Sequence, residues 1–110
     1  SLIVIQHFEK ISILEDYLRL IKAKLAPDGV AVLCYAKLET PFFGDFVEVS
    51  PQKFRKRECS LYIRPSKMEA LLSFFGFNIL SHQKRLKISD NPKRRFSMQS
   101  KVVFTHASLD

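Results

Sequence analysis

The sequence predicts an α/β fold: a mostly parallel sheet with helices packed on it and a terminal antiparallel hairpin. Two observations indicate this class. The first 36 residues alternate apolar strand-like runs with a helical period, and the end of the chain shows a period of two. The 110 residues allow one small domain but not two, so we treat residues 1–110 as a single domain.

The first 36 residues read as strand, helix, turn and strand. Residues 2–6 form a continuous apolar run, which is typical of a parallel strand buried on both faces. Ser12 and Glu15 have the spacing of a capping box at the start of a helix, and Pro27-Asp28-Gly29 ends that helix. Residues 30–36 are a second apolar run, so a right-handed βαβ unit with parallel strands is expected.

The middle of the chain carries weaker signals. Residues 37–64 mix prolines, aromatic residues and charges, and we interpret them as a long loop with one short helix near residues 50–53. Ser66, with Glu69 three residues later, predicts the start of a second helix. Gly76 is placed as the left-handed residue that ends it.

The last third predicts two strands. Residues 77–87 form the first, and the alternation over residues 96–105 marks the second. The turn-forming residues Ser89-Asp90-Asn91-Pro92 lie between them, so the two strands should form an antiparallel hairpin.

Several classes of protein and site are disfavoured. No apolar run approaches the length of about 20 residues that spans a bilayer. Cys34 and Cys59 are far apart, which argues against a disulfide framework and favours a reducing, cytoplasmic setting. The cysteines and histidines show no metal-ligand spacing, so we expect no metal site.

The chain is basic, with a formal net charge of +7. Two runs of basic residues have a phenylalanine beside them, a combination that suits contacts to a nucleic-acid backbone together with base stacking. The candidate anion-binding residues are Arg55, Lys56, Arg57, Lys93, Arg94 and Arg95. They predict RNA, DNA or an acidic protein as partner; the alternative is a solvated basic surface with no specific partner.

Four features, in order along nearly the whole chain, carry a family resemblance. They are Gln6-His7-Phe8 after the first strand, Leu25-Ala26-Pro27-Asp28-Gly29 before the second, Tyr62-Ile63-Arg64-Pro65-Ser66 leading into a helix that ends at Gly76-Phe77, and the terminal hairpin. This series resembles the carboxy-terminal half of the class I, Rossmann-like S-adenosylmethionine-dependent methyltransferases. The resemblance implies a partial Rossmann-like sheet and methyl transfer to an unidentified acceptor.

The family's cofactor cradle has no counterpart in this sequence. In the family, the first half of the domain holds S-adenosylmethionine with a Gly-rich turn after a strand. Here Gly29, Gly44 and Gly76 are the only glycines, and none belongs to a G-x-G motif. We therefore expect that the amino-terminal cofactor-binding half is absent and that the chain is inactive alone.

The resemblance places the remaining site residues. Gln6, His7 and Phe8 would lie beside the methionine part of the cofactor, because ligands bind at the carboxyl ends of strands; the alternative is ordinary packing. No catalytic base stands out, and His7 is the best-placed candidate. The substrate side would be lined by Tyr35, Phe42, Phe43 and Tyr62. These aromatics can equally cover the end of the sheet.

Two functions therefore remain in view: part of a methyltransferase, or a non-catalytic basic binding module. If the first half is absent, the strand at residues 2–6 loses its inner neighbour. An apolar strand edge of this kind invites pairing with a second chain. We accordingly expect self-association through the first strand.

Overall fold

The computed structural model describes residues 2–5, 10–38, 44–48, 61–84, 86–87, 96–97 and 99–107. Their elements, in chain order, are β1 (Leu2–Ile5), α1 (Ile11–Lys24), β2 (Val30–Lys37), β3 (Phe46–Glu48), β4 (Leu61–Ile63), α2 (Pro65–Phe74), β5 (Phe77–Gln83), β6 (Leu86–Lys87), β7 (Phe96–Ser97) and β8 (Gln99–His106).

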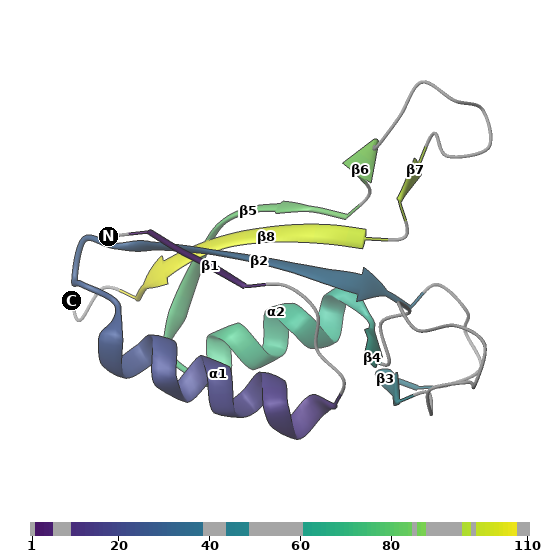
Figure 1. Ribbon diagram of the computed structural model, residues 1–110, viewed down its shortest axis with the longest axis horizontal. Coiled ribbons are helices and arrows are strands. Elements are labelled where there is room, and N and C mark those ends of the chain that lie inside the picture. The colour runs from purple at the N-terminus through teal and green to yellow at the C-terminus, as the bar shows by residue number, and fades with distance from the viewer. Residues whose placement is uncertain are drawn as a thin grey trace.

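The main sheet is mixed, and β2 is its central strand (Figure 1). Along one edge β2 pairs in parallel with β1 and then with β4; along its other edge it pairs antiparallel with β8. β5 lies beyond β8, and β3 lies beyond β4, both antiparallel to their neighbours. The expectation of a mostly parallel sheet is therefore wrong. The strands β2 and β5 run in the same direction, but β8 lies between them and is antiparallel to both. The two strands therefore do not pair with each other in parallel.

The terminal hairpin is confirmed. β5 pairs antiparallel with β8, and the shorter β6 and β7 continue the pairing beyond it. The register shifts between Ile79 and Ser81, so the hairpin carries a bulge at Leu80. The predicted turn at residues 89–92 lies outside the described residues. In the segment interpreted as one long loop, the structure instead has β3 and β4; residues 50–53 there are not described.

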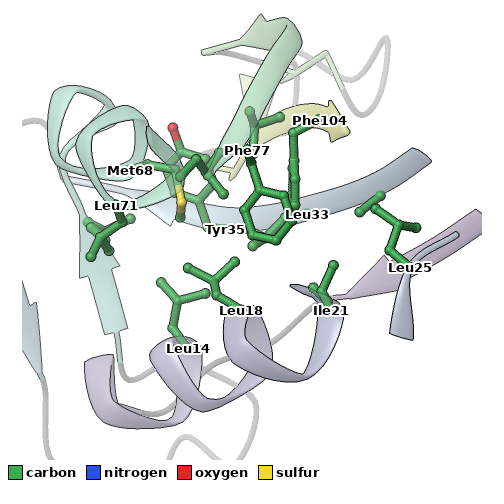
Figure 2. Packing of buried hydrophobic residues seen from close by; sticks show 14 of the residues in the cluster. Leu14, Leu18, Ile21, Leu25, Leu33, Tyr35, Met68, Leu71, Phe77 and Phe104 are labelled. Atoms are coloured by element: carbon green, nitrogen blue, oxygen red, sulfur yellow. The ribbon is translucent and has the colours of Figure 1, made fainter. Parts of the chain in front are cut away.

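Both helices cover the same face of the sheet (Figure 1). On β2, the side chains of Ala31, Leu33 and Tyr35 point to that face and are buried. In Figure 2 the side chains of α1 point toward the sheet and approach those from β2, β5 and β8. The resulting core is one cluster that includes Leu14, Leu18, Ile21, Leu33, Met68, Leu72, Phe77 and Phe104.

The two predicted helix caps are wrong. α1 begins at Ile11, and its first N–H donates to the Glu48 Oε1 atom of β3 at 2.9 Å. A carboxylate at a helix amino terminus is favourable because it meets the positive end of the helix dipole. α2 begins at Pro65, where proline's missing N–H costs nothing. Neither helix has a side-chain cap of its own, so Ser12 and Ser66 lie inside the helices.

The end of α2 agrees with the sequence. Gly76 has a φ of 82°, in the left-handed region that favours glycine. Its carbonyl accepts a hydrogen bond from the Lys22 ammonium of α1 at 2.9 Å. A Cβ atom at this position would lie 2.8 Å from Lys22 Nζ. Gly76 therefore allows the turn into β5, and a side chain there would displace only the flexible end of Lys22.

Among the described residues, no helix covers the opposite face of the sheet, which we call the open face (Figure 1). The register sets Val4, Val32 and Val103 in one row across three strands. Leu2 and Val4 of β1, and Leu80 of β5, are each more than half exposed. The expectation that the first strand is buried on both faces is wrong, because the helices cover one face only. Within the described ranges, no second layer covers the hydrophobic residues of the open face.

Among the described residues, no helix is long and apolar enough to cross a membrane.

Candidate functional site

The strands β1, β2 and β5 run in the same direction, so one edge of the sheet collects their carboxyl ends. Ligands of open α/β sheets bind at such an edge. Among the predicted site residues, the structure describes Tyr35 and Tyr62. The others lie outside the described residues: Gln6, His7, Phe8, Phe42, Phe43, Arg55, Lys56, Arg57, Lys93, Arg94 and Arg95.

Tyr35 and Tyr62 both lie in strands. Tyr35 is in β2, faces the helices and is 4% exposed. Tyr62 is half-buried in β4, where it pairs with Ala36. Because neighbouring residues of a strand point to opposite faces, Tyr62 and Tyr35 lie on opposite sides of the sheet. The two tyrosines therefore do not form one wall of a pocket.

A polar cluster surrounds the Tyr35 hydroxyl near the end of β2. The hydroxyl is hydrogen-bonded to His82 Nε2 of β5, and it also interacts with the Ser100 side chain of β8. His82 Nδ1 lies 2.7 Å from Glu69 Oε2 of α2. We call these four residues the Tyr35–His82 network.

The network runs from the core to the surface. The His82 side chain is 6% exposed, whereas that of Glu69 is 43% exposed. At the inner end, fully buried Ser100 donates a hydrogen bond to the Lys84 carbonyl at 2.7 Å. Burial raises the pKa of the Tyr35 phenol well above its usual value. The Ser100 hydrogen bond partly opposes this shift, and the Glu69 charge adds to it. The phenol is thus protonated at neutral pH.

Sequence reasoning did not find His82, and it assigned Glu69 to a helix cap. Tyr35 is 47 residues from His82, and His82 is 13 residues from Glu69, so no local motif joins them. Only the register reveals its setting: His82 pairs with the core residue Val102 of β8 and faces the helix layer.

Cys34 lies on the open face, next to Tyr35 in β2. Partial burial raises the pKa of its thiol, and the nearby Lys101 ammonium opposes part of that shift. Lys101 is the register partner of Cys34 on β8. The thiol is therefore mostly protonated, and poorly nucleophilic, at neutral pH.

The described residues do not form a cradle for a nucleotide cofactor. No glycine lies between Ile5 and Ile11, where β1 leads to α1. The glycines with positive φ are elsewhere: Gly44 precedes β3, and Gly76 ends α2. In the described part of the chain, no group of three or more His, Cys, Asp and Glu residues is placed to hold a metal ion.

Comparison with known proteins gives a likeness in fold. No protein-family model and no curated protein sequence matches the chain. Among solved structures, the chain is similar to the CcbJ methyltransferase from Streptomyces caelestis, with a TM-score of 0.56 and 14% sequence identity. The match covers 98% of this chain and 57% of that chain. At this identity the likeness concerns the fold alone: the chain has a methyltransferase-like α/β fold, and it spans 57% of the length of that neighbour.

Proposed function

We propose that the chain forms the substrate side, and one edge of the cofactor site, of an S-adenosylmethionine-dependent methyltransferase. The observation that carries this proposal is the likeness to a methyltransferase over 98% of the chain. The carboxyl ends of β1, β2 and β5 provide the edge at which such a ligand would lie. The acceptor of the methyl group is not identified.

The residues assigned to the cofactor edge are Gln6, His7 and Phe8, which follow β1 in the sequence. S-adenosylmethionine supplies an electrophilic methyl group on a sulfonium sulfur. Methyl transfer depends chiefly on alignment of the reacting atoms, so the contribution of this segment would be positioning. Because the described residues form no cradle, we assign no reaction step to them.

The open face of the sheet supports the idea that a further layer belongs to the domain. Strands of α/β proteins are normally covered on both faces. Here Val4 is 55% exposed and its row partners Val32 and Val103 are half-buried, and no helix among the described residues covers them. The neighbouring methyltransferase has 43% of its chain beyond the matched part, since the match covers 57%. We infer that an amino-terminal, cofactor-binding half belongs to the domain and that the chain alone is inactive.

A calorimetric titration with S-adenosylhomocysteine tests the proposal. We expect weak binding that changes little between low and high salt, because the thioether product carries no net charge to be screened. A basic binding module would behave differently: binding of a short single-stranded RNA should weaken steeply as salt rises. Strong, salt-sensitive RNA binding with no response to S-adenosylhomocysteine would contradict the methyltransferase proposal. It would favour the alternative, for which the net charge of +7 is the supporting observation.

We also propose that a second copy of the chain is a partner. Among the described strands β1 pairs only with β2, so its other edge is free for a second copy of the chain. Exposed apolar strand edges favour such pairing. Sedimentation at increasing concentration should show a growing dimer fraction. A monomer throughout the range would contradict this proposal.

A further inference from the structure

The side chains of the Tyr35–His82 network can form a complete set of hydrogen bonds both when His82 is neutral and when it is protonated. Its four side chains come from four elements, α2, β5, β2 and β8, and lie near the carboxyl ends of β2 and β5. Three of the four, Glu69, His82 and Tyr35, are titratable, and the Ser100 hydroxyl can both donate and accept a hydrogen bond. The inner end is closed by the Lys84 carbonyl, and the outer end, Glu69, reaches solvent.

The neutral state of His82 has a defined arrangement. An ionised Glu69 only accepts hydrogen bonds, so the His82 Nδ1 atom that faces it must carry the hydrogen. In the neutral ring Nε2 is then an acceptor, and the Tyr35 hydroxyl must donate to it. Ser100 meanwhile donates to the Lys84 carbonyl.

A protonated His82 also leaves no group without a partner. Nε2 then carries a hydrogen and donates to the Tyr35 oxygen, which can accept it. The Tyr35 hydrogen must move to another acceptor. Ser100 is the register partner of Tyr35 on β8, and its side chain interacts with the Tyr35 hydroxyl. Ser100 still donates to the Lys84 carbonyl, and the new imidazolium faces the Glu69 carboxylate.

We propose that Glu69, His82, Tyr35 and Ser100 form a proton-linked hydrogen-bond switch. When His82 takes up one proton, the Tyr35 hydroxyl turns from His82 to Ser100. When His82 releases the proton, the hydroxyl turns back. Only N–H and O–H bonds change, and protons exchange with solvent at the Glu69 end.

The charges around His82 are few among the described residues. Glu69 faces it from α2, and Tyr35 faces it from β2. From β8 its register partner is Val102, and Ser100 is uncharged. Cys34 and Lys101 point to the opposite face of the sheet. Because the Tyr35 phenol resists ionisation, it moves its proton between partners rather than losing it.

The switch gives this edge of the sheet a group that can accept a proton without losing a hydrogen bond. In the proposed methyltransferase, on which this consequence rests, it would suit a hydroxyl or amine acceptor, which must lose a proton when it is methylated. A thioether or carboxylate acceptor would not need it. The switch itself is tested without cofactor or acceptor, so its failure is distinct from a failure to bind S-adenosylhomocysteine.

The first test is nuclear magnetic resonance of the ¹⁵N- and ¹³C-labelled 110-residue chain. At the alkaline end of a titration between about pH 5 and pH 8, the ring of His82 should be the Nδ1–H tautomer. The Tyr35 Cζ signal should shift with the same midpoint as the His82 ring. A neutral ring with its hydrogen on Nε2, or a Tyr35 signal that does not follow His82, would overturn the proposal.

The second test removes the alternative acceptor. In Ser100→Ala the Tyr35 hydroxyl loses the partner it needs when His82 is protonated. A buried donor without a partner is unfavourable, so the His82 midpoint should fall by about one pH unit or more. Thr105→Val is the matched control, because Thr105 also donates from β8 to a backbone carbonyl, that of Gly29. An unchanged midpoint in folded Ser100→Ala, or an equal fall in Thr105→Val, would overturn the switch. If Ser100→Ala does not fold, the tautomer and the Tyr35 signal of the unmodified chain decide.

Discussion

Leu18 and Leu20 of α1 provide a direct test of the one-sided helix layer. The two residues are the same type, lie in the same helix and differ in environment: Leu18 is 0% exposed and Leu20 is 52% exposed. Replacing each by alanine changes helix propensity equally. The difference between the two variants therefore isolates the contact between helix and sheet.

The expected magnitudes differ several-fold. Leu18→Ala removes a fully buried side chain and leaves a cavity, which costs about 3–4 kcal/mol. Leu20→Ala loses only part of a side chain already half in water, so its cost should stay below about 1 kcal/mol. A loss of 3 kcal/mol corresponds to a fall in Tm of roughly 12 °C or more in a domain of this size.

Urea unfolding followed by circular dichroism measures both variants against the unmodified chain. If Leu18→Ala is too unstable to fold, Ile21→Val replaces it, because Ile21 is 2% exposed and the loss should be about 1 kcal/mol. Equal losses in Leu18→Ala and Leu20→Ala would refute the assignment of the buried face of α1.

Four further predictions follow from single contacts. Unfolded tyrosine ionises near pH 10, whereas Tyr35 is held protonated in the fold, so folding stability should fall by up to about 1.4 kcal/mol per pH unit above about pH 10; Tyr35→Phe should flatten that slope in urea unfolding. Glu48→Ala should lose about 1 kcal/mol by uncapping α1, and Glu48→Gln less, because its amide oxygen can still accept; equal losses in the two would contradict the cap. Gly76→Ala should lose about 1–2 kcal/mol, since alanine is strained at a φ of 82°; thermal unfolding measures it. In a Cys59→Ser background, Cys34 should react slowly with a thiol reagent at pH 7 and fast after unfolding; fast reaction in the folded chain would contradict its raised pKa.

The local elements were predictable because their signals are local. The helical period and the Pro27-Asp28-Gly29 turn fixed α1 and β2 to within a residue or two, and Gly76 was assigned correctly. The caps were not predictable, because the group that meets the start of α1 is Glu48, 37 residues away. β3 and β4 have three residues each, too few to show a period of two among the charges of their segment.

The order of the strands and the polar network were harder to predict, because both depend on contacts between residues far apart in the sequence. Nothing in the alternation of residues 96–105 tells whether that strand lies at the edge of the sheet or between β2 and β5. The polar network depends on the position of β8 between β2 and β5. β8 places Ser100 next to Tyr35, and β5, on the far side of β8, places His82 against the Tyr35 hydroxyl. The predicted cofactor-side and basic residues lie outside the described residues, so their roles stay predictions.

The central claim is that this chain supplies one edge of a cofactor site, and chemical-shift mapping tests it most directly. The labelled chain is titrated with S-adenosylhomocysteine and, separately, with adenosine monophosphate as an anionic control. We predict that S-adenosylhomocysteine binds with a dissociation constant of about 1 mM, near −4 kcal/mol, because the cradle is missing. Its shifts should centre on Gln6, His7 and Phe8 and on the end of β2. No shifts at saturating ligand, or shifts from both ligands confined to the basic runs at 55–57 and 93–95, would contradict the claim.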